Sequence, residues 1–598
     1  MYEVAVVNNA PFSLFLTRRT NEWFTACDGN WSNPNTWLSN ALDRKLILVP
    51  QPGDTVYINH TITMDSSIVV NNMYISGKLQ GTSLNAYSIT INGDIQVSGS
   101  GYLDLSLQFN NLILNGYNNL IPAANFNAGS YSTVTYNGIF DQFLLNIPYH
   151  SLTTQNGKKY QVSDITLAGN FNQQSNYEVG AYNLTINGTS TIGTVGQFLF
   201  SKNSSTGSIL FVGAVDFEGN TDLSVGNPNV EFRGGFQIHT FQFISGSGTF
   251  TFSTNNQTAN FSAYLGGSWA ANIVISGAIT LTWTGNSTVP VTGTINGTVS
   301  TSTLNNTGIL YLGNSATPMT TGVFSYAYTT TSTLGYTFNG AFTLPYSSYA
   351  GLYITGTGTK KLGANTTLSY NMSNSGTFDC NGYNLSVAGT FTNNNGDFFA
   401  TSFSSILFTG FAEIQSGPTT GFDLRTGNPN VEFRAGIDIH ANQCWTGTGI
   451  WKFSTNNQSI GYSAYNGGTP AAEFLISGAI TVTFTGGTTG TVYNTGVLNG
   501  DNASSIFINN GTFLYTNAQE PMQTGKLYCN QAANTFVYGA PGAQNIIVPS
   551  DPTSPGYKNL TLNGSGAKTL LGNVSVKGTY TLTSPATLNL NGYSLTNP

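Results

Sequence analysis

NPNVEFRGGFQIH at residues 227–239 returns as NPNVEFRAGIDIH at residues 428–440, 201 positions further along the chain. The likeness extends over 227–285 and 428–486, where FSTNNQ recurs unchanged and SGAITLTWTG becomes SGAITVTFTG. An internal duplication of this length predicts a body built from stacked copies of one unit. A residue type that is kept in both copies is therefore explained first by the fold that the copies share.

Looser copies of the same unit can be followed along most of the chain. Turns rich in Gly and Lys occur at 155–159, 356–361 and 564–568, and related strand-like phrases begin at 85, 180, 381 and 591. From this pattern we predict an N-terminal attachment segment at 1–25 and a capping β region at 26–125. Two repeat units follow at 126–329 and 330–530, and a truncated third unit occupies 531–598.

Apolar and polar residues alternate with a period of two almost everywhere, as in 183–188, 249–253 and 479–485. These short runs end at Asn-Gly, Gly-Thr-Gly or Gly-Gly, which is typical of strands and turns. No long stretch shows a helical period with helix-favouring residues, so the chain is predicted to be all-β. Asn and Gly at the turns favour a parallel β-helix, or β-solenoid, built from repeats of about 200 residues. Tandem β-sandwich domains are the alternative.

The composition excludes several classes of protein. Charged residues make up 7% of the chain, against roughly 25% in ordinary soluble domains. The net charge is -7 and no Lys/Arg cluster is present, which argues against a nucleic-acid partner. The apolar runs are only strand-sized, so we expect no insertion into a membrane. The N-terminal basic pair follows the apolar stretch, which reverses a secretory signal and predicts a protein that is not exported by the general route.

The four cysteines are far apart and form no CxxC pair: Cys27, Cys380, Cys444 and Cys529. The duplication aligns Cys380 with Val179 and Cys444 with Phe243, both apolar. We therefore expect Cys380 and Cys444 to be small buried residues, since free Cys is commonly buried. Disulfides and a zinc site are poorly supported.

The segment at 28–65 resembles a known family. It reads DGNWSNPNTW and then VPQPGDTVYINHTITMD, and is followed by rungs of the type SITINGDIQVSG. These motifs resemble bacteriophage virion proteins, the tail-fibre and related particle proteins with β-helical bodies. The later phrases YKNLTL, NGSGAKTL and NGYSL are similar to repeats in large surface adhesins of Bacteroidetes.

The resemblance implies a structural or adhesive component of a phage particle, in the tail, a fibre or a head appendage. Its location would be the virion, assembled in the host cytoplasm and extracellular after release. Its partners would be other virion proteins, further copies of itself in a homotrimer, and host-surface glycan. The alternatives are a bacterial cell-surface adhesin and a polysaccharide depolymerase of the tailspike type.

Trp31 and Trp37 flank Pro34 in the N-terminal motif. Independently of any resemblance, we predict that they form an N-terminal cap over the open end of the solenoid. An uncovered first turn would expose unpaired backbone and a bare core. A sugar-stacking site at the two tryptophans is the alternative.

No catalytic set can be recognised. Glu231 and Asp222 recur in the second copy, and Asp216 aligns with Glu413 after a four-residue gap, so we interpret these acids as structural. Glu231 and Arg233 are two apart on one strand face and should form a rim ion pair of small net stability. His239 and His440 correspond and are too far apart in sequence to indicate one shared site. We expect no enzyme activity, no cofactor and no metal.

Aromatic residues are the remaining functional candidates. Trp283 and Trp451 each exchange with Phe between the copies, which indicates core positions. Trp269 and Trp445 are instead replaced by Pro470 and Ile244, residues of other shape. Packing in the core is the favoured interpretation for Trp269 and Trp445 too, but if any ring is exposed and stacks on glycan, these two are the candidates.

Overall fold

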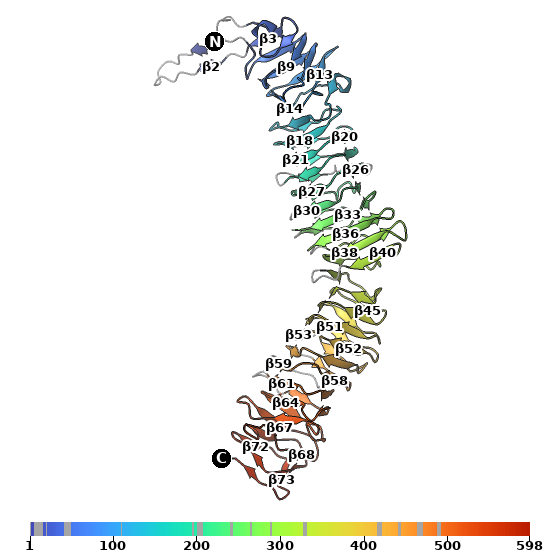
Figure 1. Ribbon diagram of the computed structural model, residues 1–598, viewed down its shortest axis with the longest axis vertical. Helices are drawn as coiled ribbons and strands as arrows, with labels where there is room; N and C mark the ends of the chain where they lie inside the picture. The colour runs from blue at the N-terminus through green and yellow to red at the C-terminus, as the bar shows by residue number, and fades with distance from the viewer. Residues whose placement is uncertain are drawn as a thin grey trace. The chain divides into compact units, whose positions relative to one another are not determined.

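A computed structural model shows how the chain folds (Figure 1). It describes residues 2–4, 16–18, 21–40, 49–108, 110–193, 197–199, 207–239, 243–262, 266–286, 290–326, 332–415, 421–440, 444–462, 471–486 and 492–597. Within them the chain is 47% strand and about 1% helix, with parallel sheets stacked as a β-solenoid of about 22 turns. The predicted β-solenoid is confirmed. Tandem sandwiches are excluded, because their sheets would be antiparallel.

The helices within these residues are two short 3-10 turns, η1 (Pro34–Thr36) and η2 (Ala123–Asn125). In the described part of the chain, therefore, no helix has the length and apolar character needed to span a bilayer.

The chain divides into two compact units. The first comprises 1–308 and 318–325, and the second comprises 309–317 and 326–598. This division falls next to the predicted border of the two repeat units at 329/330. Of the predicted attachment segment 1–25, residues 1, 5–15 and 19–20 lie outside the described residues. Two short strands from that segment, β1 (Tyr2–Val4) and β2 (Leu16–Arg18), pair antiparallel.

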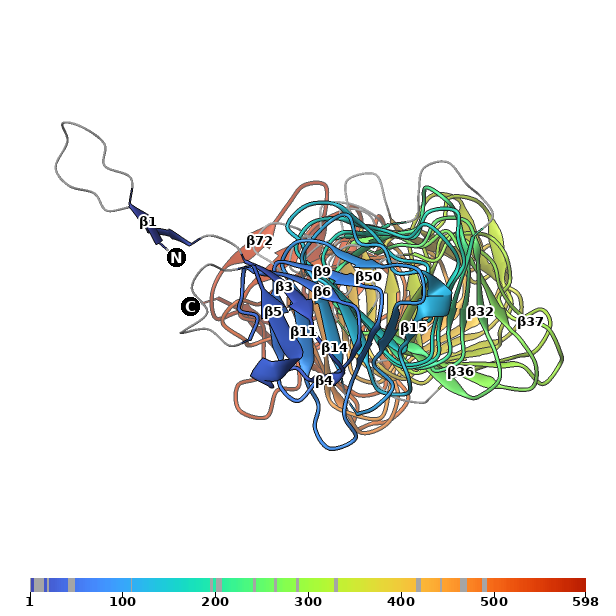
Figure 2. The same ribbon diagram turned by 90° about the horizontal axis from the view of Figure 1, so that it is seen from above.

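The first unit is organised around one long parallel sheet. In Figure 2 the strands of its first turns, β3 (Glu22–Thr25), β6 (Thr55–Ile58) and β9 (Asn72–Ile75), lie side by side, as their parallel pairing requires. The long sheet contains β8 (Ile68–Val70), β11 (Ser88–Ile91), β14 (Asn111–Leu114), β16 (Thr133–Tyr136), β18 (Ser151–Gln155), β21 (Phe171–Gln174), β24 (Ser190–Ile192), β27 (Val215–Phe217), β30 (Phe236–Ile238), β33 (Gln257–Phe261), β36 (Thr280–Gly285), β38 (Thr303–Asn306) and β40 (Val323–Tyr326).

The second unit is also built from parallel sheets, of which three are the main ones. One of them runs from β39 (Ile309–Leu312) to β66 (Lys526–Tyr528), and another from β43 (Ser348–Tyr349) to β63 (Leu498–Gly500). The third sheet contains β42 (Phe342–Leu344), β45 (Thr359–Leu362), β48 (Thr377–Asp379), β51 (Asp397–Phe399), β54 (Phe422–Asp423) and β57 (Cys444–Trp445).

Alternate residues of each strand fill the interior. In β29 (Asn229–Phe232) the side chains of Val230 and Phe232 are buried, while Glu231 points outward. Parallel register places like residues over one another, so that Phe232 stacks on Phe211 with ring centroids 5.5 Å apart. The period-two pattern of the sequence is thus the inside–outside alternation of a solenoid wall.

The repeated motif at 227–239 and 428–440 is explained by its turns. Asn227 and Asn428 adopt φ of 46° and 45°, a left-handed conformation that Asn tolerates better than most residues. The Asn227 side chain accepts a hydrogen bond from the backbone N–H of Ser247 on the following turn, at 2.6 Å. Asn428 accepts the equivalent bond from Thr448 at 2.7 Å. Identical residues in the two copies therefore perform the same structural task.

The same holds for the repeated ion pair. Arg233 Nε lies 2.7 Å from Glu231 Oε1, and Arg434 Nε lies 2.8 Å from Glu432 Oε1. All four side chains are about one-quarter to one-third exposed, which confirms the predicted rim pairs.

The N-terminal tryptophans lie at the first turn. Their ring centroids are 4.7 Å apart, and Trp37 Nε1 donates to the backbone carbonyl of Trp31 at 2.8 Å. Trp37 begins β5 (Trp37–Ser39), which pairs antiparallel with β3 and is the outermost strand of its sheet. With only 4% and 6% of Trp31 and Trp37 exposed, neither ring offers a face for sugar stacking.

The burial predicted for Cys380 and Cys444 is confirmed. Cys529 is also buried, whereas Cys27, which has no counterpart in the duplication, is exposed. Cys27 lies in the irregular segment between β3 and β4 (Gly29–Asn30), where no alternating strand directs its side chain inward. None of the four cysteines forms a disulfide bond with another.

Candidate functional site

A column of outward side chains crosses three neighbouring strands of the second unit. Phe399 of β51 is the register partner of Asp423 of β54, and Asp423 is the partner of Trp445 of β57. The preceding residue of each strand, Phe398, Phe422 or Cys444, is fully buried. The alternation of the strands therefore presents Phe399, Asp423 and Trp445 together on the outer face.

This column lines a hollow of about 400 Å³. Its other lining residues are Asp397, Thr401, Gly421 and Thr426. Pockets for small ligands span roughly 300–1,000 Å³, so the hollow is large enough for a sugar-sized ligand. Its lining combines two aromatic rings with carboxylates and hydroxyls, the groups that recognise a molecule with apolar faces and a polar edge.

Arg425 fixes the polar side of the hollow. Its Nε and Nη2 donate to the two carboxylate oxygens of Asp423 at 2.9 and 2.6 Å. Burial raises the pKa of Asp423, but the hydrogen bonds and charge of Arg425 outweigh burial and leave the pKa below its ordinary value. Asp423 is thus an ionised acceptor whose orientation is set by a two-point contact.

The same guanidinium holds the Trp445 ring. The guanidinium carbon of Arg425 lies 4.2 Å from the ring centroid, a cation–π contact. Neighbouring strands are about 4.8 Å apart, so Phe399 and Trp445, two strands apart, are separated by about 10 Å. Two aromatic platforms therefore flank one fixed carboxylate along the solenoid axis.

The hydrogen bonds of Asp397 complete the wall. Asp397 Oδ1 accepts from the backbone N–H of Gly421 at 3.0 Å, which ties β51 to the next turn. The other acid near the hollow, Asp379, is buried and receives the Thr401 hydroxyl at 2.9 Å. These bonds hold the side of the hollow in one arrangement.

The first unit has the same column with different residues. Leu199, Asp222 and Ile244 occupy the positions of Phe399, Asp423 and Trp445. In place of Arg425 stands Ser224, whose hydroxyl donates to Asp222 at 2.6 Å. The carboxylate is common to both units, whereas the aromatic rings and the arginine occur in the second unit alone.

Packing in the core, the favoured interpretation of Trp269, is confirmed, and its candidacy for glycan stacking is wrong. The side chain is 1% exposed and lies inside the first unit. Its ring centroid is 5.3 Å from that of Phe243 and 5.2 Å from that of Phe250. Trp269 therefore cannot stack on a glycan, and it lies in a different unit from Trp445.

Trp445 is half-buried and borders the hollow, so it remains a candidate for stacking. Sequence reasoning missed its neighbours Phe399, Arg425 and Asp397. A signal for Arg425 was present, because the duplication aligns it with Ser224 and marks a change from a small neutral residue to a cation.

Comparison with known proteins adds nothing to these observations. No family model, no curated protein and no solved structure matches the chain.

Proposed function

We propose that this protein is a structural and adhesive component of a bacteriophage particle, and that it contacts the host surface by binding glycan at the hollow beside Trp445. The observation that carries the binding proposal is the column of Phe399, Asp423 and Trp445. Aromatic rings stack on the apolar faces of sugars, while Asp423 and Arg425 offer an acceptor and donors to sugar hydroxyls.

The internal duplication supports this assignment. Structural residues such as Asn227 and Asn428 are the same in both copies, whereas the aromatic rings and the arginine of the hollow are found in one copy only. The low charge, 7% of residues, also suits a protein that works outside a cell, because contacts between neutral groups are little affected by salt. The phage assignment itself rests on the N-terminal resemblance at 28–65.

The binding proposal is tested with variants that the duplication supplies. Trp445→Ile and Arg425→Ser introduce the residues of the first unit into the same backbone, so both variants should fold. Binding of the purified protein to capsular and lipopolysaccharide fractions from candidate hosts is measured by biolayer interferometry. Each variant should weaken binding about tenfold, equivalent to ~1.4 kcal/mol.

Tyr117→Ser is the matched control, because Tyr117 is an exposed aromatic residue (63%) outside the hollow. It should bind as the wild type does. Equal losses in Tyr117→Ser and Trp445→Ile, or full binding by Trp445→Ile, would contradict a glycan site at the hollow.

The particle assignment has its own test. Immunogold labelling of phage particles with antibody against this chain should mark a tail, a fibre or a head appendage. The proposed homotrimer is tested by sedimentation of the purified chain, whose protomer mass is 63.5 kDa. Labelling of bacterial envelopes, with none on particles, would instead favour the cell-surface adhesin.

A polysaccharide depolymerase is a second candidate, because two carboxylates, Asp397 and Asp423, border the same hollow. Glycan cleavage commonly uses a pair of acids, one of which must be protonated. The lowered pKa of Asp423 suits the ionised partner and not the general acid. Release of new reducing ends from a bound polysaccharide, abolished in Asp397→Asn, would favour this activity over adhesion alone.

A further inference from the structure

Two acids and a histidine converge on the outer face of the first unit, away from the hollow beside Trp445. Asp216 lies in β27 and points outward between the buried Val215 and Phe217. Glu218 follows two residues later and so shares this face. His239 comes directly after β30, the neighbouring strand, and its backbone N–H donates to the carbonyl of Phe217.

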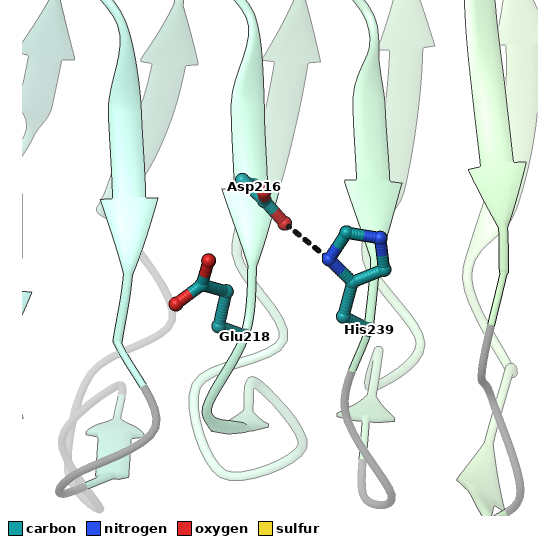
Figure 3. A group of neighbouring side chains, drawn as sticks. All are labelled: Asp216, Glu218 and His239. Carbon is teal, nitrogen blue, oxygen red and sulfur yellow. Dashed lines mark ion pairs between the residues drawn. The ribbon is translucent and has the colours of Figure 1, made fainter.

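Figure 3 shows the Asp216 carboxylate directed toward the His239 ring, with the Glu218 carboxylate on the side of Asp216 away from His239. One ligand atom from each of Asp216, Glu218 and His239 lies within 4.8 Å of the others. His239 Nδ1 is 3.3 Å from Asp216 Oδ1, and both side chains are about one-third exposed. A cation placed among them would therefore contact two carboxylates and one imidazole, with room for water or another ligand.

The acids of this cluster differ from three other outward-facing acids in having no cationic side chain beside them in the described part of the chain. Glu231, Glu432 and Asp423 each contact an arginine. Among the residues described, no Lys or Arg lies within 4.0 Å of Asp216 or Glu218. Asp216 Oδ1 is also shielded from solvent, and apart from its 3.3 Å ion-pair contact with His239 Nδ1 it accepts no hydrogen bond from a described residue. Two adjacent carboxylates with this surrounding are stabilised by a bound cation.

We propose that Asp216, Glu218 and His239 bind one divalent transition-metal ion of the Zn²⁺ or Mn²⁺ class. An imidazole donor selects these ions over Ca²⁺ and Mg²⁺, which prefer all-oxygen shells. Three protein ligands on an open face leave coordination positions for water or an oxygen-bearing ligand. Two hollows, of about 410 and 390 Å³, adjoin Glu218 and Asp216 respectively.

The second unit supplies a matched comparison. Glu413 and Asp438 are register partners there, and His440 Nε2 lies 2.9 Å from Asp438 Oδ2. The position of Glu218 is occupied by Gln415, whose amide donates to Glu413. This arrangement has the same residue types, but within the described residues it places no three ligand atoms as close as those of the first unit.

The test uses untagged protein with Cys27→Ser, which removes the exposed thiol, after treatment with a chelator. Zn²⁺ alone is titrated by isothermal calorimetry. One site is expected, and His239→Ala and Glu218→Gln should each weaken it more than about tenfold. His440→Ala should bind as the parent does. Hydrogen exchange of each variant verifies that the turns around 215–239 stay folded.

X-ray absorption of the Zn²⁺ complex gives a second measurement. A shell of nitrogen and oxygen with an imidazole signature is expected. Absence of Zn²⁺ binding, sulfur in the shell, equal loss in His440→Ala and His239→Ala, or tighter binding of Ca²⁺ than of Zn²⁺ would each overturn the proposal. These results do not depend on glycan binding, so this inference and the proposed function can fail separately.

Discussion

Replacing Lys360 by Met should open one turn of the second unit. The Lys360 side chain is fully buried, and its ammonium, with three N–H donors, lies within hydrogen-bond distance of four backbone carbonyl oxygens. These belong to Phe338 at 2.9 Å, Gly340 at 3.0 Å, Thr357 at 3.3 Å and Gly358 at 3.2 Å. The four carbonyls lie on two successive turns, so the lysine joins one turn to the next.

The arrangement recurs with the Gly/Lys-rich turns of the sequence. Lys159 Nζ donates to the carbonyls of Gly138 at 3.0 Å and Gly157 at 2.9 Å. Lys568 Nζ donates to those of Ala540 and Gly542, both at 2.9 Å. A buried cation at three equivalent places, bound by carbonyls each time, indicates a structural role that the repeat preserves.

The expected cost follows from these contacts. A hydrogen bond to a charged group contributes about 1.5–3 kcal/mol, and a buried acceptor left without a donor costs about 1–3 kcal/mol. Met retains most of the apolar stem but provides no donor. Burial of the charged ammonium costs free energy and so offsets part of the stabilisation by these hydrogen bonds. The same burial lowers the pKa of Lys360. Allowing for this offset, we expect Lys360→Met to lower the local free energy of unfolding by ~3 kcal/mol.

Hydrogen exchange with mass spectrometry measures this effect locally, which suits a stack whose turns open separately. Amides at 337–340 and 357–362 should exchange about 100-fold faster, as ~3 kcal/mol requires. Lys361→Met is the control, because Lys361 is adjacent and faces outward on the same strand. Unchanged exchange in Lys360→Met, or the same acceleration in Lys361→Met, would refute the role given to the buried ammonium.

Three further outcomes are expected. Burial lowers the pKa of Lys159 from 10.5 to about 8, so between these pH values the unfolded chain binds more protons than the folded one. The free energy of unfolding of the wild type, measured by urea titration, should therefore rise relative to that of Lys159→Met as the pH increases from about 8 to 10.5. A fall over this range would contradict the prediction. Trp269→Ala should destabilise the first unit by about 3–5 kcal/mol, because it leaves a cavity among aromatic rings; calorimetry measures the loss, and a change below ~1 kcal/mol would mean that the ring is not in the core. In the folded protein a thiol reagent should label Cys27 rapidly and the three buried cysteines only after unfolding, as mass spectrometry of the labelled peptides will show.

The fold was predictable because short sequence patterns specify each strand and turn, and these patterns recur along the chain. Alternation in NVEF specifies a wall strand, and Asn227 with its copy Asn428 specifies the turn that precedes it. Each of these residues makes its contacts within its own turn or with the next one. A short stretch of sequence is therefore enough to predict a turn of the solenoid. The duplication then shows which residues obey it.

Core and surface tryptophans could not be told apart in this way. Trp269 and Trp445 both lack an aromatic counterpart, yet one is buried and the other borders a hollow. Packing in the core explains why Trp269 has no aromatic counterpart. Trp269 packs on Phe250 in the first copy, and the second copy has the larger Trp451 at the position of Phe250. The larger ring at that position compensates for the missing tryptophan. A substitution pattern at one position does not record what its neighbours have gained or lost.

Apart from Trp445, the grouping of residues at both candidate sites was not predicted, and the reason is different. Asp216 and His239 are 23 residues apart, and Phe399 and Trp445 are 46 apart, because each pair is separated by whole turns of the solenoid. The turns differ in length, so no fixed spacing brings such residues to notice as a motif. Only the strand register identifies them as neighbours. In a solenoid, a functional site is therefore formed by side chains at matching positions of successive turns. The columns whose residues differ between duplicated copies are the first places to look for function.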